Sequence, residues 1–165
     1  MKYKSFEDLP VWKDAIELAV RVFALTEKPC FRGHSGTRNQ LENAAVSISN
    51  SVAEGFERGT TQELLTFIYI SRGSAGEVRS MLHLFDLLTQ FKDFKFEISD
   101  LKLRSISISR QLRGWADSLQ NSDIRGQRYL TDKSRRMTKE SQEREEFLEE
   151  LRRIREGNGP GSIPD

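Results

Sequence analysis

The side chains in this sequence with the strongest potential for chemistry are one cysteine and two histidines. Cys30 and His34 share the segment from Pro29 to Gly36, whereas His83, the other histidine, falls in a separate predicted helix. Structural zinc sites usually collect four Cys, His or carboxylate ligands. A nucleophilic thiol needs a neighbouring base or a helix N-terminus to lower its pKa, and the sequence places neither beside Cys30. We therefore expect no metal site and no catalytic cysteine.

Carboxylates are abundant, with 25 Asp and Glu residues, but their spacing does not predict a site. Helix bundles that bind two metal ions use Glu-x-x-His pairs, and neither histidine follows a glutamate at that distance. The sequence predicts no catalytic residue and no cofactor. An enzyme is accordingly the weakest class of function, and a non-enzymatic binding or assembly protein is the strongest.

The composition is that of a soluble helical protein with one domain and an appendage. The chain has 165 residues, of which 36% are hydrophobic and 31% are charged, and its net charge is +1. No apolar run approaches the roughly 20 residues of a membrane span, and the N-terminal MKYKSFEDLP lacks the apolar core of a signal peptide. The single cysteine also favours a cytoplasmic location and excludes an internal disulfide. Nucleic-acid binding by so neutral a chain would need a local basic patch.

Hydrophobic periodicity predicts an all-α fold: an antiparallel up-down-up-down four-helix bundle over residues 1–120. The first helix is expected to begin near Asp8, the second near Thr37, the third at Thr60 and the fourth near Glu97. The expected buried side of the first helix consists of Leu9, Trp12, Ile16, Ala19, Phe23 and Leu25. The expected buried side of the third consists of Leu64, Phe67, Ile68, Ser71, Ala75, Val78, Leu82 and Phe85.

Two helix starts carry the spacing of a capping box, in which each side chain satisfies a free backbone N–H group. Thr37 and Gln40 form one such pair, and Thr60 and Glu63 form the other. Gly55 and Gly59 bracket the turn between the second and third helices. We expect this turn to use the positive φ that glycine adopts without strain.

A polar stripe runs along the second predicted helix, opposite its apolar side. Its members are Asn43, Ser47, Asn50 and Glu54. Asn and Ser lower helix propensity, so their concentration on one face has two interpretations: a surface that a second molecule approaches closely, or an ordinary solvated face. The third helix has glycines at positions 73 and 76, and each costs roughly 1 kcal/mol relative to alanine. Close approach of another backbone or a kink would explain them.

Two segments resemble the signatures of a known family. Residues 47–55, SISNSVAEG, resemble its "SIxxNIAEG" signature, with Val52 in place of isoleucine, and Phe67 with residues 73–77 resembles its "F…GSxxE" signature. Residues 6–12 resemble its opening "FxxLxVW". The family is that of bacterial four-helix-bundle proteins encoded by rRNA intervening sequences, and it includes the accessory variability determinants of diversity-generating retroelements. The resemblance extends over about residues 5–120.

The resemblance implies a self-associating scaffold or accessory protein, a homopentameric ring that binds a partner protein. It implies subunit contacts through the helices that bear Asn50 and Glu54, and Gly73 and Glu77. The expected interface set is Asn43, Ser47, Asn50, Glu54, Gly73, Gly76 and Glu77. The alternative is a nucleic-acid-binding accessory of a reverse transcriptase in a diversity-generating retroelement, with that enzyme and its template RNA as partners. Such members are strongly basic, whereas this chain is nearly neutral.

The candidate nucleic-acid contacts are arginines that have few acidic residues near them in the sequence. They are Arg104, Arg110, Arg113, Arg125, Arg128, Arg135 and Arg136. A solvated helix face or linker is the alternative interpretation. Phe91, Phe94 and Phe96 alternate with charged residues, which is typical either of a base-stacking surface or of a loop fastened to the end of a bundle. We favour the second interpretation.

After Gln120 the chain is expected to form a charged extension of the bundle. Residues 121–165 hold ten basic and ten acidic residues. We expect a linker, then a short helix at about residues 138–156, then a disordered end. In the helix, glutamates precede arginines, which suits the helix dipole, and Glu149 and Arg153 have a favourable i,i+4 spacing.

Overall fold

The computed structural model describes residues 3–121 and 132–155, and in the second range the side chains of residues 140 and 143–153. The chain divides into two compact units, Met1–Arg128 and Tyr129–Asp165. The described residues are all-α and contain no strand, as the periodicity predicts. None of the described helices has the length and apolar character that crossing a membrane requires.

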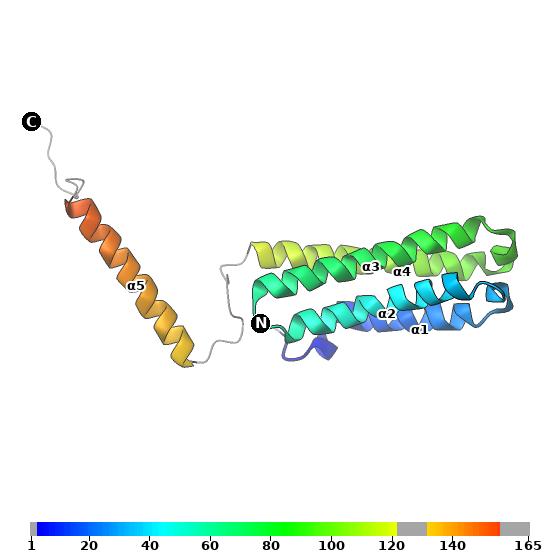
Figure 1. Ribbon diagram of the computed structural model, residues 1–165, viewed down its shortest axis with the longest axis horizontal. Coiled ribbons are helices and arrows are strands. Elements are labelled where there is room, and N and C mark those ends of the chain that lie inside the picture. The colour runs from blue at the N-terminus through cyan, green and yellow to red at the C-terminus, as the bar shows by residue number, and fades with distance from the viewer. Residues whose placement is uncertain (1–2, 122–131, 156–165) are drawn as a thin grey trace, which may run out of the picture. The chain divides into compact units, whose positions relative to one another are not determined.

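Four long helices make up the first unit (Figure 1). They are α1 (Pro10–Thr26), α2 (Ser35–Glu57), α3 (Thr61–Leu87) and α4 (Lys95–Gln120). Short 3₁₀ turns stand before and between them: η1 (Phe6–Asp8), η2 (Pro29–Phe31) and η3 (Thr89–Phe94). α2 packs against α1 and α3, and α4 packs against α3 and α1. Each helix therefore has two neighbours around one core.

Hydroxyl groups tie α3 to the helices on either side of it. The buried Ser71 hydroxyl donates to the Ile48 carbonyl of α2 at 2.9 Å, and the buried Ser105 hydroxyl of α4 donates to the Ala75 carbonyl at 2.6 Å. Serine is small enough for helices to approach closely, and these bonds satisfy its polar atom inside the core. Because both acceptors are backbone carbonyls, the bonds fix the spacing between helices without depending on another side chain.

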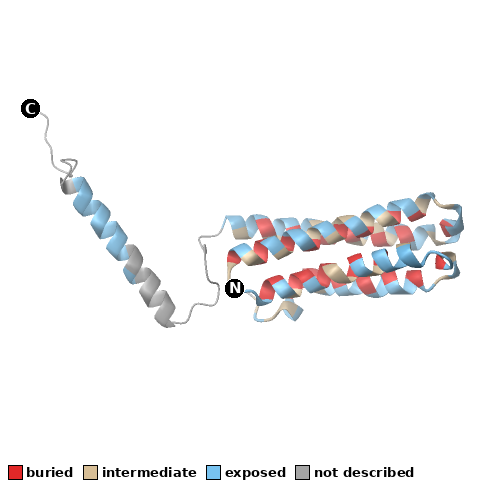
Figure 2. Cartoon of the chain, viewed as in Figure 1, coloured by how far each residue is buried: buried red, intermediate tan, exposed pale blue. Residues whose placement is uncertain are grey.

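The buried side of α1 differs from the predicted one. The buried residues of this helix are Val11, Ala15, Leu18, Ala19, Val22, Leu25 and Thr26. Ile16 and Phe23, which the sequence predicts to be buried, are exposed. Figure 2 shows buried and exposed residues interspersed along the four helices. Apolar residues occupy more than one side of α1, so the pattern alone does not select the core side. The side that faces the core carries Ala15 and Ala19, whose small side chains admit neighbouring helices.

The two predicted capping boxes have different outcomes. Thr60 caps α3 as predicted, because its Oγ1 accepts a hydrogen bond from the Glu63 backbone N–H at 3.2 Å. The Thr37 prediction is wrong: α2 begins at Ser35 after His34, so Thr37 already lies in the first turn of the helix.

The glycine prediction for the turn is also wrong. α2 continues through Gly55 to Glu57. Gly33, before α2, is the one glycine with positive φ in the part of the chain that the structure describes, at 82°.

Removing the α3 cap gives a direct test of the helix start. We expect Thr60→Ala to lower the free energy of unfolding by about 1 kcal/mol, because the Glu63 N–H group loses its acceptor. Thr37→Ala is the matched control and should leave that free energy nearly unchanged. Urea denaturation of both variants measures the difference, and equal losses would contradict the assigned cap.

The second unit contains α5 (Asp132–Arg155). This helix begins well before residue 138, the predicted start. The predicted pair forms between Arg153 Nη2 and Glu149 Oε1 at 3.5 Å. Phe147, Leu148 and Leu151 are exposed within this unit. Most of the predicted linker and the predicted disordered end lie outside the described residues.

Candidate functional site

The predicted polar stripe of α2 lies on the exposed side of that helix, beside α3. Asn43, Asn50 and Glu54 are exposed, and Ser47 is half-buried. The Ser47 hydroxyl lies 2.8 Å from the Ser74 hydroxyl of α3, so the stripe borders the seam between the two helices. Three of its four residues are therefore available to a second molecule.

The expected interface residues on α3 are also accessible at the surface. Gly73 and Glu77 are exposed, and Gly76 is half-buried. A Cβ atom added at Gly73 or Gly76 would meet no other atom within 4 Å. Packing within the chain thus gives no reason for either glycine, and α3 runs uninterrupted through both positions. Within the described residues, therefore, no neighbouring segment accounts for either glycine.

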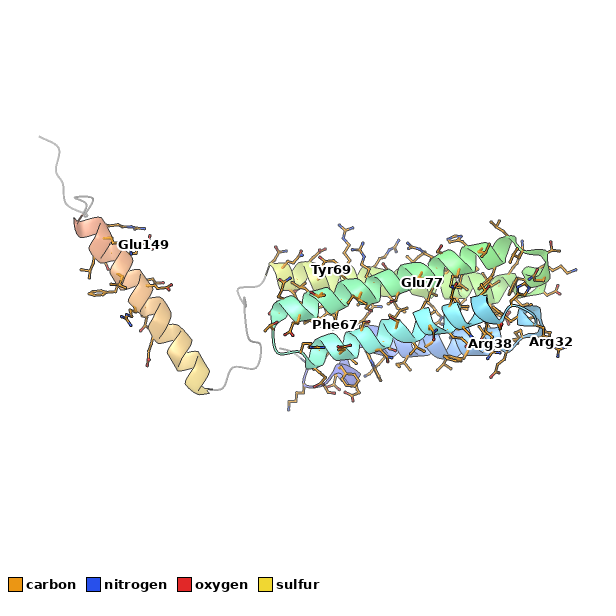
Figure 3. All side chains as sticks on the ribbon, viewed as in Figure 1. Arg32, Arg38, Phe67, Tyr69, Glu77 and Glu149 are labelled. Carbon is orange, nitrogen blue, oxygen red and sulfur yellow. The ribbon has the colours of Figure 1, made fainter. Side chains whose placement is uncertain are left out.

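Gly55 is different, because it lies buried where α2 meets α3. A Cβ atom at this position would come within 2.6 Å of the Phe67 Cβ and 3.3 Å of a Leu64 methyl group. Phe67, half-buried, lies on the side of α3 that faces α2 (Figure 3). Gly55 belongs to the first signature and Phe67 to the second, so the two signatures meet where these residues pack against each other. Their joint role is to let α2 and α3 approach closely near the turn that connects them.

An arginine joins both helices on the surface above this contact. Arg58 Nη2 lies 2.6 Å from Glu54 Oε1, and the same guanidinium lies 3.8 Å from a Glu63 carboxylate oxygen. The guanidinium also covers the Phe67 ring, 5.2 Å from its centroid. The hydrogen bond to Glu54 raises the pKa of Arg58. Glu54 thus has a role within the chain beyond the predicted interface, and its i,i+4 spacing to Arg58 is visible in the sequence.

Among the candidate nucleic-acid contacts, Arg104 is surrounded by acidic groups. Its Nε lies 2.8 Å from Asp100 Oδ2, and its Nη1 lies 3.2 Å from Glu17 Oε1. Arg21 pairs with the same two carboxylates, at 2.9 Å from Glu17 and 3.4 Å from Asp100. The hydrogen bond to Asp100 is the main cause that raises the pKa of Arg104. The expectation that Arg104 has little acidic company is wrong, because Asp100 lies four residues before it in α4 and Glu17 approaches it from α1.

The remaining arginine candidates divide into three groups. Arg110 is exposed and has no ion-pair partner among the described residues. Arg113 makes one loose contact, 3.7 Å from Asp117 Oδ2, and both side chains are largely exposed. The others are not described at the level of the side chain: Arg125 and Arg128 lie outside the described residues, and Arg135 and Arg136 lie in α5 without described side chains.

The side chains with potential for chemistry make local contacts. His34 Nε2 lies 2.8 Å from the Gln90 amide nitrogen, which links the loop before α2 to η3. Burial is the main cause that raises the pKa of the Cys30 thiol, and Glu97 adds to it, so the thiolate is disfavoured. Within the described ranges, no three His, Cys, Asp or Glu side chains are grouped so that they could hold a metal ion.

Three phenylalanines form a cluster at one end of the four helices. The Phe91 ring centroid lies 4.9 Å from that of Phe31 and 4.8 Å from that of Phe85. Phe91 is buried, which confirms for this residue that the aromatic segment fastens a loop to the bundle. Phe94 is half-buried beneath Lys28, whereas Phe96 is 87% exposed. Only part of the alternating aromatic pattern is therefore structural.

The family model described as 23S rRNA-intervening sequence protein matches residues 7–118. The chain belongs to this family. The match confirms the resemblance read from the two signatures, and it covers α1, α2, α3 and nearly all of α4. Ser51, which stands at the asparagine position of the first signature, is buried in α2. No curated protein matches the chain.

Proposed function

We propose that this 23S rRNA-intervening sequence protein family member is a non-enzymatic scaffold or accessory protein that self-associates. In this proposal it forms a homopentameric ring of antiparallel up-down-up-down four-helix bundles, acts in the cytoplasm and binds a partner protein. Membership of the family supports the proposal, because the resemblance implies such a ring.

The observation that carries the proposal is the unfilled space around Gly73 on α3. Gly73 is exposed in the helix interior, where it costs roughly 1 kcal/mol relative to alanine. Since a Cβ at Gly73 would meet no atom within 4 Å, that cost brings no packing advantage among the described residues. A second subunit that packs over Gly73 provides the advantage. The exposed side chains of Ile70 and Leu84 on the same helix favour such a contact.

The α2 stripe supplies polar contacts at the edge of the same surface. Asn43, Asn50 and Glu54 are exposed, and the Ser47–Ser74 contact joins the stripe to α3. Asn and Ser can donate and accept hydrogen bonds across an interface at close range. An interface with apolar positions on α3 and a polar rim on α2 has the usual organisation of a subunit contact.

Glu77 gives the cleanest test of the proposed surface. It is exposed and has no ion-pair partner among the described residues, so reversing its charge removes no ion pair from the described chain. We expect Glu77→Lys to shift the protein toward monomer at micromolar concentration while its helix content and unfolding midpoint in dilute solution stay close to wild type. Asp93→Lys, an exposed acidic position in η3, is the matched control. Sedimentation of the three proteins measures the effect; an unchanged oligomer in Glu77→Lys would contradict the surface.

A second candidate function rests on Arg110, which is exposed and unpaired among the described residues. The alternative is a nucleic-acid-binding accessory of a reverse transcriptase in a diversity-generating retroelement. Ring assembly would repeat a small basic patch in every subunit. Contacts through Arg110 and Arg113 would reach phosphates, so affinity for single-stranded RNA should fall with salt by a log–log slope of about −0.7 per phosphate. Titration of labelled RNA at low salt, with Arg110→Glu/Arg113→Glu as the comparison, decides this: equal binding by both proteins contradicts the patch.

A further inference from the structure

One exposed apolar surface lies on α1. Ile16, Val20 and Phe23 are 37%, 63% and 42% exposed. Their spacing of four and three residues places them along one side of the helix. We call these three residues the α1 stripe. Large apolar side chains grouped in this way on a soluble protein are typical of a surface that another molecule covers.

A second exposed apolar surface lies on α3 and has a different shape. Ile70 and Leu84 are 46% and 50% exposed, and Gly73 lies between them on the same side of the helix. No atom lies within 4 Å of a Cβ added at Gly73, so the surface is recessed at this glycine. The side chains of Ile70 and Leu84 project from the helix on either side of it. We call Ile70, Gly73 and Leu84 the α3 notch.

The stripe and the notch belong to helices that are not packing neighbours. α1 packs against α2 and α4, and α3 packs against the same two helices. The stripe therefore does not cover the notch of its own chain. Two different surfaces that fit each other produce a head-to-tail contact between copies, and such contacts close into rings when the rotation between copies permits.

We propose that the α1 stripe of one copy packs on the α3 notch of a second copy. This inference rests on the proposed self-association and names the two surfaces that meet. The charges beside the surfaces are complementary: Lys13 precedes the stripe, Glu77 lies beside Gly73, and neither has an ion-pair partner among the described residues.

The positions of these charges agree with the contacts expected near Ile70 and Gly73, whereas Leu84, about 10 Å beyond Glu77, lies outside the α1 stripe in this register. Lys13 lies about 10 Å along α1 from Val20, and Glu77 lies about 10 Å along α3 from Ile70. When the two helices run in opposite directions with Lys13 opposite Glu77, Val20 therefore falls opposite Ile70. In the same register Ile16 falls opposite Ser74, about 1.5 Å along the axis from Gly73, where an apolar side chain has room to enter.

Two variants that each disable one surface test the proposal. Val20→Arg places a charge in the stripe, and Gly73→Arg fills the notch. Both positions are exposed, and the Gly73 position is open, so the fold should tolerate both changes. Leu103→Arg, at a 64% exposed position on α4, is the matched control. Circular dichroism verifies the helix content, and sedimentation measures the mass of each variant and of their mixtures.

Each of the two variants should be monomeric by itself, and Leu103→Arg should keep the wild-type mass. An equimolar mixture of Val20→Arg and Gly73→Arg should form a dimer and nothing larger, because one intact stripe and one intact notch remain. A wild-type oligomer in either variant, or a mixture that stays monomeric, overturns the proposal while self-association stands. A monomeric wild-type protein overturns both.

Discussion

Replacing Phe91 by alanine should lower the free energy of unfolding by about 3–5 kcal/mol. Phe91 is 1% exposed, and its ring stacks on that of Phe85 and meets the edge of Phe31. Truncation removes both contacts and leaves a cavity at the end of the four helices. Because α3, η3 and η2 all meet at this cluster, the remaining side chains cannot collapse without moving a helix end.

Phe96→Ala is the matched control for this prediction. Phe96 lies close by in the sequence but is 87% exposed, so its truncation should change the free energy of unfolding by less than about 0.5 kcal/mol. Chemical denaturation of both variants provides the comparison. Similar losses for the two would contradict the division of this aromatic segment into a buried anchor and an exposed side chain.

The second large effect is expected for Gly55→Ala. Alanine is the better helix former by about 1 kcal/mol, so a purely local argument predicts a gain in stability. The added methyl group would lie 2.6 Å from the Phe67 Cβ, which is attached directly to the α3 backbone and cannot rotate away. The helices must separate, and overpacking of this kind costs about 1–3 kcal/mol. We therefore expect a net loss of stability.

Gly114→Ala is the control that isolates this packing effect. Gly114 is exposed in α4, and a Cβ there would meet no atom within 4 Å. Alanine at this position should raise the free energy of unfolding by up to about 1 kcal/mol. Thermal or urea unfolding of both variants shows whether each substitution raises or lowers the free energy of unfolding. A stabilised Gly55→Ala variant would contradict the close contact between α2 and α3.

Local patterns predicted much of the fold. The 3.6-residue period of α3 is unambiguous from Leu64 to Phe85, and the Thr60 cap needs only four consecutive residues, so both could be read from the sequence. α1 could not be predicted so well, because it carries apolar residues on two sides. Which side enters the core depends on how α2 and α4 pack against it, and the sequence of α1 does not contain that information.

The candidate site was predictable to a smaller extent, for the same reason. The exposed positions of Asn50 and Gly73 follow from helical periodicity. The contact between Gly55 and Phe67 and the pairing of Arg104 with Glu17 join residues on different helices. Such contacts depend on the relative register of helices, which a single sequence does not specify. The interface prediction thus remains a prediction. Arg104 is not an unbalanced charge, and its i,i+4 spacing to Asp100 is visible in the sequence, whereas its contact with Glu17 is not.

Sedimentation equilibrium of the wild-type protein at micromolar concentration tests self-association most directly. The chain has a mass of 19.0 kDa, and a homopentamer predicts a single species of about five times that mass. Circular dichroism on the same sample establishes that the helices are formed. A folded species that sediments at 19.0 kDa over the whole concentration range would contradict the proposed assembly.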